Sequence, residues 1–189
     1  SYQHYDKTTS IKNIEAVVYD ALGNEIKKIK RKDFKDQSAV GGSTLFSDSR
    51  VLYLNYTPVS YPFTIVYTSE IETSNTAFIP KWYFIGGYNL SVEKCVLNVT
   101  YPKGLGFKKK EFQFNHFNIQ KTADTDTNLS YVATNIVAQK QEDLSPSPSD
   151  LFPKIMMGLE NFHLEGVDGN ATTWEAFGKW YGDKILTGT

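Results

Sequence analysis

Two neighbouring stretches decide the fold, YNLSVEKCVLNVTYPKGLGF (residues 88–107) and KKKEFQFNHFNIQKT (residues 108–122). In both, polar and apolar residues alternate, and successive side chains on a β-strand point to opposite faces. The second stretch places its large apolar residues on two faces, Phe112 with Phe114 and Phe117 with Ile119. The Pro and Gly residues of YPKGLG lie between the two runs, so the sequence predicts strands joined by a turn.

The same pattern recurs along the rest of the chain. Residues 11–34 (IKNIEAVVYDALGNEIKKIKRKDF) predict a strand, a Gly/Asn turn and a second strand. Residues 49–73 predict two more strands, and Pro58 and Pro62 suit strand ends or an exposed edge rather than a central strand. Residues 122–140 predict a polar turn followed by a strand.

Short strands joined by turns are typical of mainly β proteins, and 12 Tyr, 12 Phe and 3 Trp suit a half-buried sheet. The sequence therefore predicts an antiparallel β-sandwich or curved-sheet domain with a C-terminal α-helix. We expect the antiparallel β domain over residues 1–144. A Pro-rich crossing and return segment of the same domain follows over residues 145–171, and the helix lies within residues 172–189.

Within the return segment, EDLSPSPSDLFP (residues 142–153) contains three prolines. They argue against regular structure there and predict an extended surface crossing. The apolar stretch KIMMGLENFHLEG (residues 154–166) is ambiguous between helix and strand, and VDGN (residues 167–170) predicts a Gly/Asn turn.

The C-terminal helix is predicted from about Trp174 to Leu186, and Thr172 and Thr173 can cap it. Thr172 and Glu175 have the Thr-x-x-Glu spacing of a capping box, in which the two residues satisfy each other's backbone N–H groups. Aromatic and apolar residues recur at helical spacing as one stripe: Trp174, Phe177, Tyr181 and Ile185.

Composition excludes little but points away from two partners. The chain has 20 Lys+Arg and 21 Asp+Glu, so its overall charge favours neither nucleic acid nor an anionic membrane. No apolar run approaches the ~20 residues of a membrane span, and none has the form of a signal peptide. Cys95 is the single cysteine, which excludes an intrachain disulfide and predicts a buried structural thiol.

The sequence predicts no catalytic residue, no metal site and no cofactor. His4, His116 and His163 lack the i, i+4 partner of a zinc-binding helix. Cys95 lies in mid-strand, without the strand-to-helix setting that exposes and activates a thiolate.

DTDTN (residues 124–128) copies the first half of a calcium loop, with Asp124, Asp126 and Asn128 at alternate positions. Leu129 stands where such a loop needs Gly, and Asn135 stands where it needs a bidentate Glu. A solvated polar turn explains the stretch better.

Two basic runs, Lys27–Lys32 and Lys108–Glu111, are diluted by acidic residues and carry no interleaved aromatic loop for base stacking. We expect them to be charged sheet edges that block edge-to-edge pairing.

PKWYFIGGY (residues 80–88) raises a binding hypothesis. Trp82, Tyr83 and Tyr88 would form an aromatic platform for a sugar ring. The competing interpretation, which we favour, is a Trp that packs in the core beside a Gly-Gly turn.

Several phrases in order resemble a known family. They are VVYDALGNEIKKIKRKDFKDQSA, GGSTLFSDSRVLYLNYTPVSYPFTIVYTSE, NTAFIPKWYF, SVEKC, FHLEGVDG and WEAFGKWYGDKIL, and they span about Tyr5 to Leu186. The chain resembles the bacterial domain of unknown function that stands immediately before a transglutaminase-like domain in exported multidomain proteins.

The resemblance implies a largely antiparallel β architecture, similar to the N-terminal sheet domain of zinc aminopeptidases without the metal-binding helix. It also implies an exported, periplasmic or cell-surface location and an adjacent transglutaminase-like domain that carries a Cys-His-Asp triad. On this expectation the aromatic stripe of the terminal helix packs on the sheet, and Trp180 and Lys184 contact the neighbouring domain.

Two functions from different classes remain open at this point. The first is a non-catalytic scaffold that positions or presents substrate to a transglutaminase-like domain. The second is a module of the cell envelope that binds glycan or protein through Trp82, Tyr83 and Tyr88.

Overall fold

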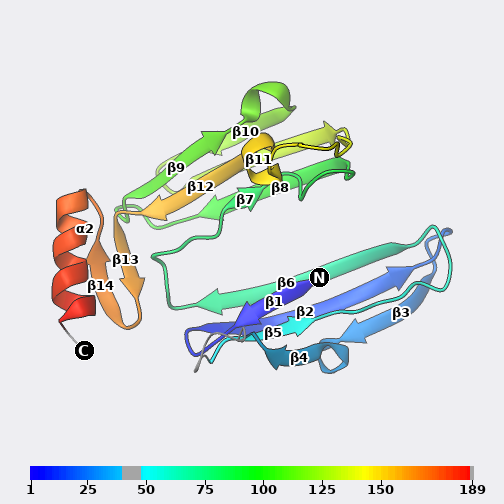
Figure 1. The fold of residues 1–189 in the computed structure, drawn as a ribbon, viewed down its shortest axis with the longest axis horizontal. Coiled ribbons are helices and arrows are strands. Elements are labelled where there is room, and N and C mark those ends of the chain that lie inside the picture. Colours follow the sequence, from blue (N-terminus) through cyan, green and yellow to red (C-terminus); the bar gives the residue numbers. More distant parts are fainter. Residues whose placement is uncertain (40–47, 188–189) are drawn as a thin grey trace. The chain divides into compact units, whose positions relative to one another are not determined.

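Every strand pairing in the computed structural model, which describes residues 1–39 and 48–187, is antiparallel. Contacts divide the chain into two compact units, Ser1–Asn75 and Thr76–Thr189, and each is described by itself (Figure 1). The division falls inside the stretch 1–144 that the sequence predicts as one β domain. Residues 41–47, which begin one phrase of the family resemblance, lie outside the described residues.

The first unit is built from two three-stranded sheets, with strand orders β3-β2-β6 and β1-β5-β4. Its strands are β1 (Tyr2–Tyr5), β2 (Thr9–Tyr19), β3 (Glu25–Lys30), β4 (Lys35–Ser38), β5 (Arg50–Tyr53) and β6 (Thr64–Thr73), with a 3-10 turn at Arg31–Asp33. Both sheets contribute side chains to one core, which includes Ile14 and Ala16 of β2 and Leu52 of β5.

The predicted alternation of β2 is confirmed. Ile14, Ala16 and Val18 are at most 2% exposed, because every second residue of the strand faces the core. β2 and β3 form the predicted hairpin. In its turn the Asp20 carboxylate accepts hydrogen bonds from the backbone N–H groups of Leu22 and Asn24, at 2.9 Å each.

The second unit has two three-stranded sheets, with orders β10-β11-β8 and β7-β12-β9, and a β13-β14 hairpin. Its strands are β7 (Trp82–Tyr83), β8 (Val92–Thr100), β9 (Phe107–Phe112), β10 (Ile119–Asp124), β11 (Asn128–Ile136), β12 (Lys154–Leu159), β13 (Asn161–Leu164) and β14 (Val167–Asn170). Its helical elements are α1 (Pro148–Leu151), a 3-10 turn (Phe114–His116), and α2 (Trp174–Trp180), which continues as a π-helical segment (Tyr181–Leu186).

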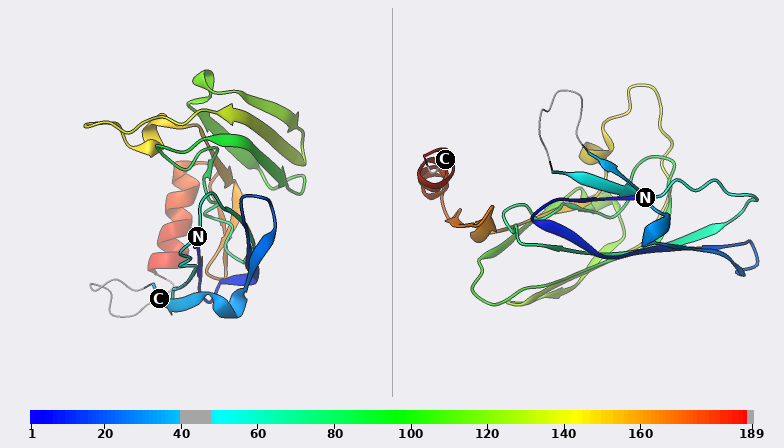
Figure 2. Two further views of the ribbon diagram at one scale, coloured as in Figure 1. Left: turned by 90° about the vertical axis from the view of Figure 1, so that its right-hand side faces the viewer. Right: turned by 90° about the horizontal axis from the view of Figure 1, so that it is seen from below.

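The core of this unit lies between its two sheets. Tyr131 of β11 and Ile155 of β12 come from different sheets and are 1% and 0% exposed. Figure 2 shows the C-terminal helix beside the β13–β14 hairpin, at the end of this unit.

The predicted run over residues 108–122 is not one strand. β9 ends at Phe112, Gln113 adopts a left-handed conformation with φ of 58°, and a 3-10 turn follows at Phe114–His116. The chain thereby leaves one sheet and enters the other at β10. Phe114 packs against the core together with Phe117 and Ile119, whereas Phe112 does not. The predicted division of these four residues between two faces is therefore wrong.

Two predictions about the return segment were wrong. Residues 148–151 form a single helical turn, because Pro148 stands at its N-terminal end, where a missing N–H group costs nothing. VDGN is strand β14 rather than a turn, and the hairpin turns instead at Glu165 and Gly166. Gly169 is needed for close packing, since an added Cβ would lie 2.4 Å from Cζ of Phe162.

The predicted fold class is confirmed: the chain is mainly β with antiparallel sheets and one short helix near the C-terminus. Among the described helices, none combines the length and apolar character needed to cross a membrane.

Candidate functional site

The terminal helix begins at Trp174, where the sequence predicts it. Thr173 is the N-cap, and its hydroxyl oxygen accepts a hydrogen bond from the Ala176 backbone N–H at 3.0 Å. The Thr172–Glu175 capping box is therefore wrong, because the Thr172 backbone N–H is already bound by the Asn170 side chain at 3.0 Å.

The helix is held on the β13–β14 hairpin by aromatic contacts. The ring of Trp180 packs edge-on against Phe162 at a centroid distance of 4.8 Å, and Phe177 lies 6.2 Å from the same ring. The Trp180 indole N–H donates a 2.8 Å hydrogen bond to the carbonyl oxygen of Asp168 on β14. Trp180 therefore contacts the hairpin of its own unit, as Phe177 does, and its contact with a neighbouring domain stays a prediction.

The helix and its π-helical continuation also expose large apolar residues. Trp174 is 88% exposed, Tyr181 is 43% exposed and Leu186 is 63% exposed. A hollow of about 310 Å³ beside Trp174 is lined by residues 171–174 and Phe177. We call Trp174, Tyr181 and Leu186 the aromatic face. Large exposed apolar residues grouped on one element are candidates for an interaction site.

Lys184 is exposed in the π-helical segment. Its contact with a neighbouring domain stays a prediction.

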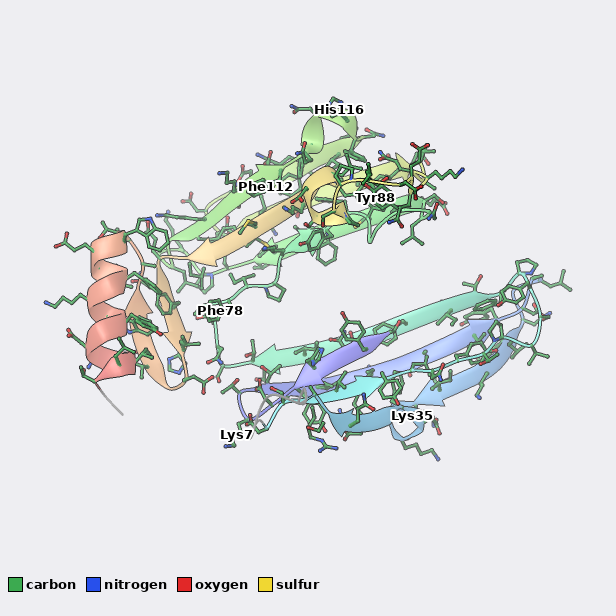
Figure 3. All side chains as sticks on the ribbon, in the orientation of Figure 1. Lys7, Lys35, Phe78, Tyr88, Phe112 and His116 are labelled. Carbon is green, nitrogen blue, oxygen red and sulfur yellow. The ribbon has the colours of Figure 1, made fainter. Side chains whose placement is uncertain are left out.

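The structure does not bring Trp82, Tyr83 and Tyr88 together as a platform. Trp82 and Tyr83 are consecutive on β7, so they point to opposite faces. Trp82 packs against the core, whereas Tyr83 is 40% exposed. Tyr88 packs edge-on against Phe152 at 5.2 Å and donates its hydroxyl hydrogen to the Pro146 carbonyl oxygen at 2.8 Å (Figure 3).

Cys95 lies on β8, half-buried and paired across the sheet with Ala133. Burial raises the pKa of its thiol more than the nearby indole N–H of Trp82 lowers it. Since the thiolate is the nucleophile, this environment opposes reactivity. In the described parts of the chain, no hydrogen bond joins Cys95 to an imidazole.

One histidine has a carboxylate partner that the sequence pattern did not reveal. His163 Nδ1 lies 2.8 Å from Asp168 Oδ1, because the two residues are directly opposite on the β13–β14 hairpin. The sequence could have predicted this pair. A two-residue turn at Glu165 and Gly166 sets the hairpin register in which His163 lies opposite Asp168. His116 lies in the 3-10 turn and His4 on β1.

The half-match to a calcium loop is a hairpin turn whose carboxylates are bound by lysines. Asp126 pairs with Lys103 at 2.8 Å, and Asp124 pairs with Lys121 at 3.2 Å and also with Lys109. The residues that the structure describes contain no cluster of three His, Cys, Asp or Glu side chains arranged to hold a metal ion.

A polar network joins β9 to β10 and β11, and so connects the two sheets. Lys121 Nζ lies 3.0 Å from Glu111 Oε1, which also accepts the Tyr131 hydroxyl hydrogen. Burial raises the pKa of Glu111, but these two donors together outweigh it and the pKa is lowered. Burial and the Glu111 carboxylate raise the pKa of Tyr131. The hydrogen bond to Glu111 raises that of Lys121.

The prediction that both basic runs lie at sheet edges is confirmed. β3 carries most of Lys27–Lys32 and is the edge of the β3-β2-β6 sheet, and β9 carries Lys108–Glu111 at the edge of β7-β12-β9.

The fold has a relative among solved structures. The crystal structure of a "putative protease" from Parabacteroides distasonis matches with a TM-score of 0.63 and 13% sequence identity, over 83% of this chain and 32% of that chain. At this identity the match shows the fold alone, and the chain spans about a third of that protein's length. A search of curated protein sequences gave no match. Residues 2–140 match the model of a family described as a domain of unknown function with a solved structure, DUF3857.

Proposed function

The chain belongs to the DUF3857 family of domains of unknown function, and we propose that it is the non-catalytic β-scaffold of an exported bacterial transglutaminase-like protein. In this proposal the scaffold positions the adjacent transglutaminase-like domain, or presents substrate to it, in the periplasm or at the cell surface. The chemistry belongs to the Cys-His-Asp triad of that neighbour.

Two lines of support concern the longer protein. The ordered phrases of the sequence resemblance run from about Tyr5 to Leu186, and the domain that they resemble stands before a transglutaminase-like domain, which supports such a neighbour here. The structurally similar Parabacteroides protein is about three times as long as the matched region, since the match covers 32% of its chain. The sequence resemblance and the length of the Parabacteroides protein therefore both support a further domain beside this fold.

The aromatic face carries the proposal. A Trp that is 88% exposed is unusual, because Trp is a residue that proteins mostly bury. Trp174 is also held in place: it packs edge-on against Phe177 at 6.2 Å, and Phe177 packs on the hairpin through Phe162. Trp is one of the residues that most often dominate binding energy at interfaces.

Hydrogen exchange in the full-length protein tests this role. We expect the amides of residues 174–186 to be more strongly protected when the transglutaminase-like domain is present than in this chain alone. Replacing Trp174 by Ala should cost about 2 kcal/mol of docking free energy, as truncation of a central interface Trp typically does, and remove the extra protection.

Phe78→Ala is the matched control, since Phe78 is 76% exposed in the same unit but lies outside the helix (Figure 3). It should leave the protection of residues 174–186 unchanged. Equal protection of these amides with and without the neighbouring domain would contradict the docking role.

A further inference from the structure

The outer face of the β7–β12–β9 sheet gathers lysines and aromatic rings. In the strand register, Tyr83, Lys154 and Phe112 lie side by side across the three strands, and Met156 is opposite Lys110 in the next row on the same face. Their sequence neighbours Trp82 and Ile155 point into the core. We call these five residues, Tyr83, Lys110, Phe112, Lys154 and Met156, the lysine–aromatic face.

Two ammonium groups share one ring on this face. Lys110 Nζ lies 5.2 Å and Lys154 Nζ 5.3 Å from the centroid of Phe112, within the range of a cation–π contact. Lys154 also donates a hydrogen bond to the Ser149 carbonyl oxygen. In residues 1–39 and 48–187, neither ammonium group has a carboxylate within ion-pair distance. By contrast, Lys109, which points the other way on β9, is paired with Asp124.

An uncompensated pair of like charges on a sheet face creates a local positive potential, and this favours an anionic group at that place. The ring of Phe112 serves to hold the ammonium groups. Tyr83 is the other aromatic ring of this face. It is 40% exposed, so a ligand ring can stack on it.

A hollow adjoins Tyr83. It has a volume of about 270 Å³, and its walls carry the hydroxyl groups of Ser147 and Ser149, which lie 2.9 Å apart. Hydroxyl groups beside an amphipathic aromatic ring match a sugar, which has an apolar face and a rim of hydroxyls. The size of the hollow suits a single sugar residue better than an extended polymer.

We propose that the lysine–aromatic face binds an acidic polysaccharide. A sugar ring stacks on Tyr83, its hydroxyls meet Ser147 and Ser149, and the carboxylate of a neighbouring uronic acid lies between Lys110 and Lys154. Single-stranded nucleic acid fits less well, since it needs several stacking rings for successive bases and a continuous cationic track. This binding is separate from the aromatic face and goes beyond the scaffold function.

Affinity electrophoresis and calorimetry with alginate and polygalacturonate test the proposal, with neutral dextran, poly-glutamate and single-stranded DNA as comparison polymers. We expect the uronate polymers to bind and to weaken as salt screens the charges. Lys110→Gln and Tyr83→Ala should each weaken binding about tenfold, corresponding to about 1.4 kcal/mol. Lys94→Gln, which changes an exposed lysine on β8, should leave binding unchanged.

Each other outcome overturns the proposal. These are no binding of either uronate polymer, equal binding of dextran, tighter binding of poly-glutamate or DNA, and Lys110→Gln binding like the parent protein. In the described structure the Lys110 side chain contacts the Phe112 ring and makes no hydrogen bond or ion pair, so Lys110→Gln should fold like the parent protein. The thermal midpoint of each variant checks that it is folded. The test does not involve a neighbouring domain, so its failure leaves the scaffold proposal intact.

Discussion

At the scale of single residues, Gly169 shows how a packing constraint can resemble a turn signal. Its place in VDGN predicted a turn, yet it lies in β14 opposite Phe162. A Cβ at this position would lie 2.4 Å from Phe162 Cζ and 2.8 Å from Trp180 Cε2, closer than atoms approach in proteins. The absence of a side chain lets the helix lie directly on the hairpin.

We therefore expect Gly169→Ala to destabilise the second unit by about 1–3 kcal/mol, the usual cost of overpacking. Chemical denaturation measures the change. Gly158→Ala is the matched control, because Gly158 is also in a strand and an added Cβ there has no neighbour within 4 Å. Similar losses of stability in the two variants would contradict this explanation.

A second residue-scale prediction concerns Glu111 and acid. Its pKa is lowered in the folded chain, so it contributes stability above its unfolded pKa of about 4.3, and this contribution is lost as pH falls through the folded pKa. The urea midpoint should fall below about pH 4 in the parent protein, and fall less steeply in Glu111→Gln. Glu93→Gln, on β8 and outside the network, should keep the parental slope.

At the scale of elements, period-two patterns were readable where one face of a strand is buried. The β2–β3 hairpin follows from Ile14, Ala16 and Val18, and the polar turn at Asp20 marks its end. Residues 108–122 were harder, because both β9 and β10 obey the same pattern and the left-handed Gln113 between them leaves no signal in the sequence. The prediction of irregular structure at Pro148 was wrong for another reason: proline interrupts a helix in its interior but is favoured at its first position.

The cap of the terminal helix gives the third prediction. Thr173→Ala removes the hydroxyl that accepts the Ala176 N–H and should destabilise the helix by about 1 kcal/mol. Amide exchange over residues 174–186 would quicken accordingly. Thr172→Ala should have a much smaller effect, and if Thr172 were as important as Thr173 the observed cap would be wrong.

At the scale of the whole molecule, the sequence predicted the fold class but left the site incomplete. The local alternation of polar and apolar residues is enough to predict a strand. The side of the helix that faces the hairpin depends instead on Gly169 and Phe162, which belong to other elements. Trp180 was assigned outward for this reason. Of the predicted stripe, Phe177 contacts Phe162 of the hairpin, whereas Trp174 and Tyr181 are exposed. The positions of Lys110 and Lys154 around Phe112 required the register of β9 and β12, which the ambiguous stretch 154–166 did not give.

Two separate cores lead to a prediction for the entire chain. Ile14 belongs to the core of the first unit and Ile155 to that of the second. Replacing either by Ala should cost about 2–5 kcal/mol, and amide exchange should quicken mainly in the unit that carries the change. Equal quickening in both units after either substitution would contradict two cores that open separately.

The hydrogen bond from the Trp180 indole to the Asp168 carbonyl has a practical consequence for spectroscopy. The three tryptophans have different surroundings. Trp82 packs against the core, Trp180 is hydrogen-bonded to the hairpin, and Trp174 is almost fully exposed. A collisional quencher such as iodide should reach Trp174 first and extinguish the red side of the emission band. The remaining fluorescence would then come from the enclosed indoles, so a shift in quenching would report directly when something covers the helix.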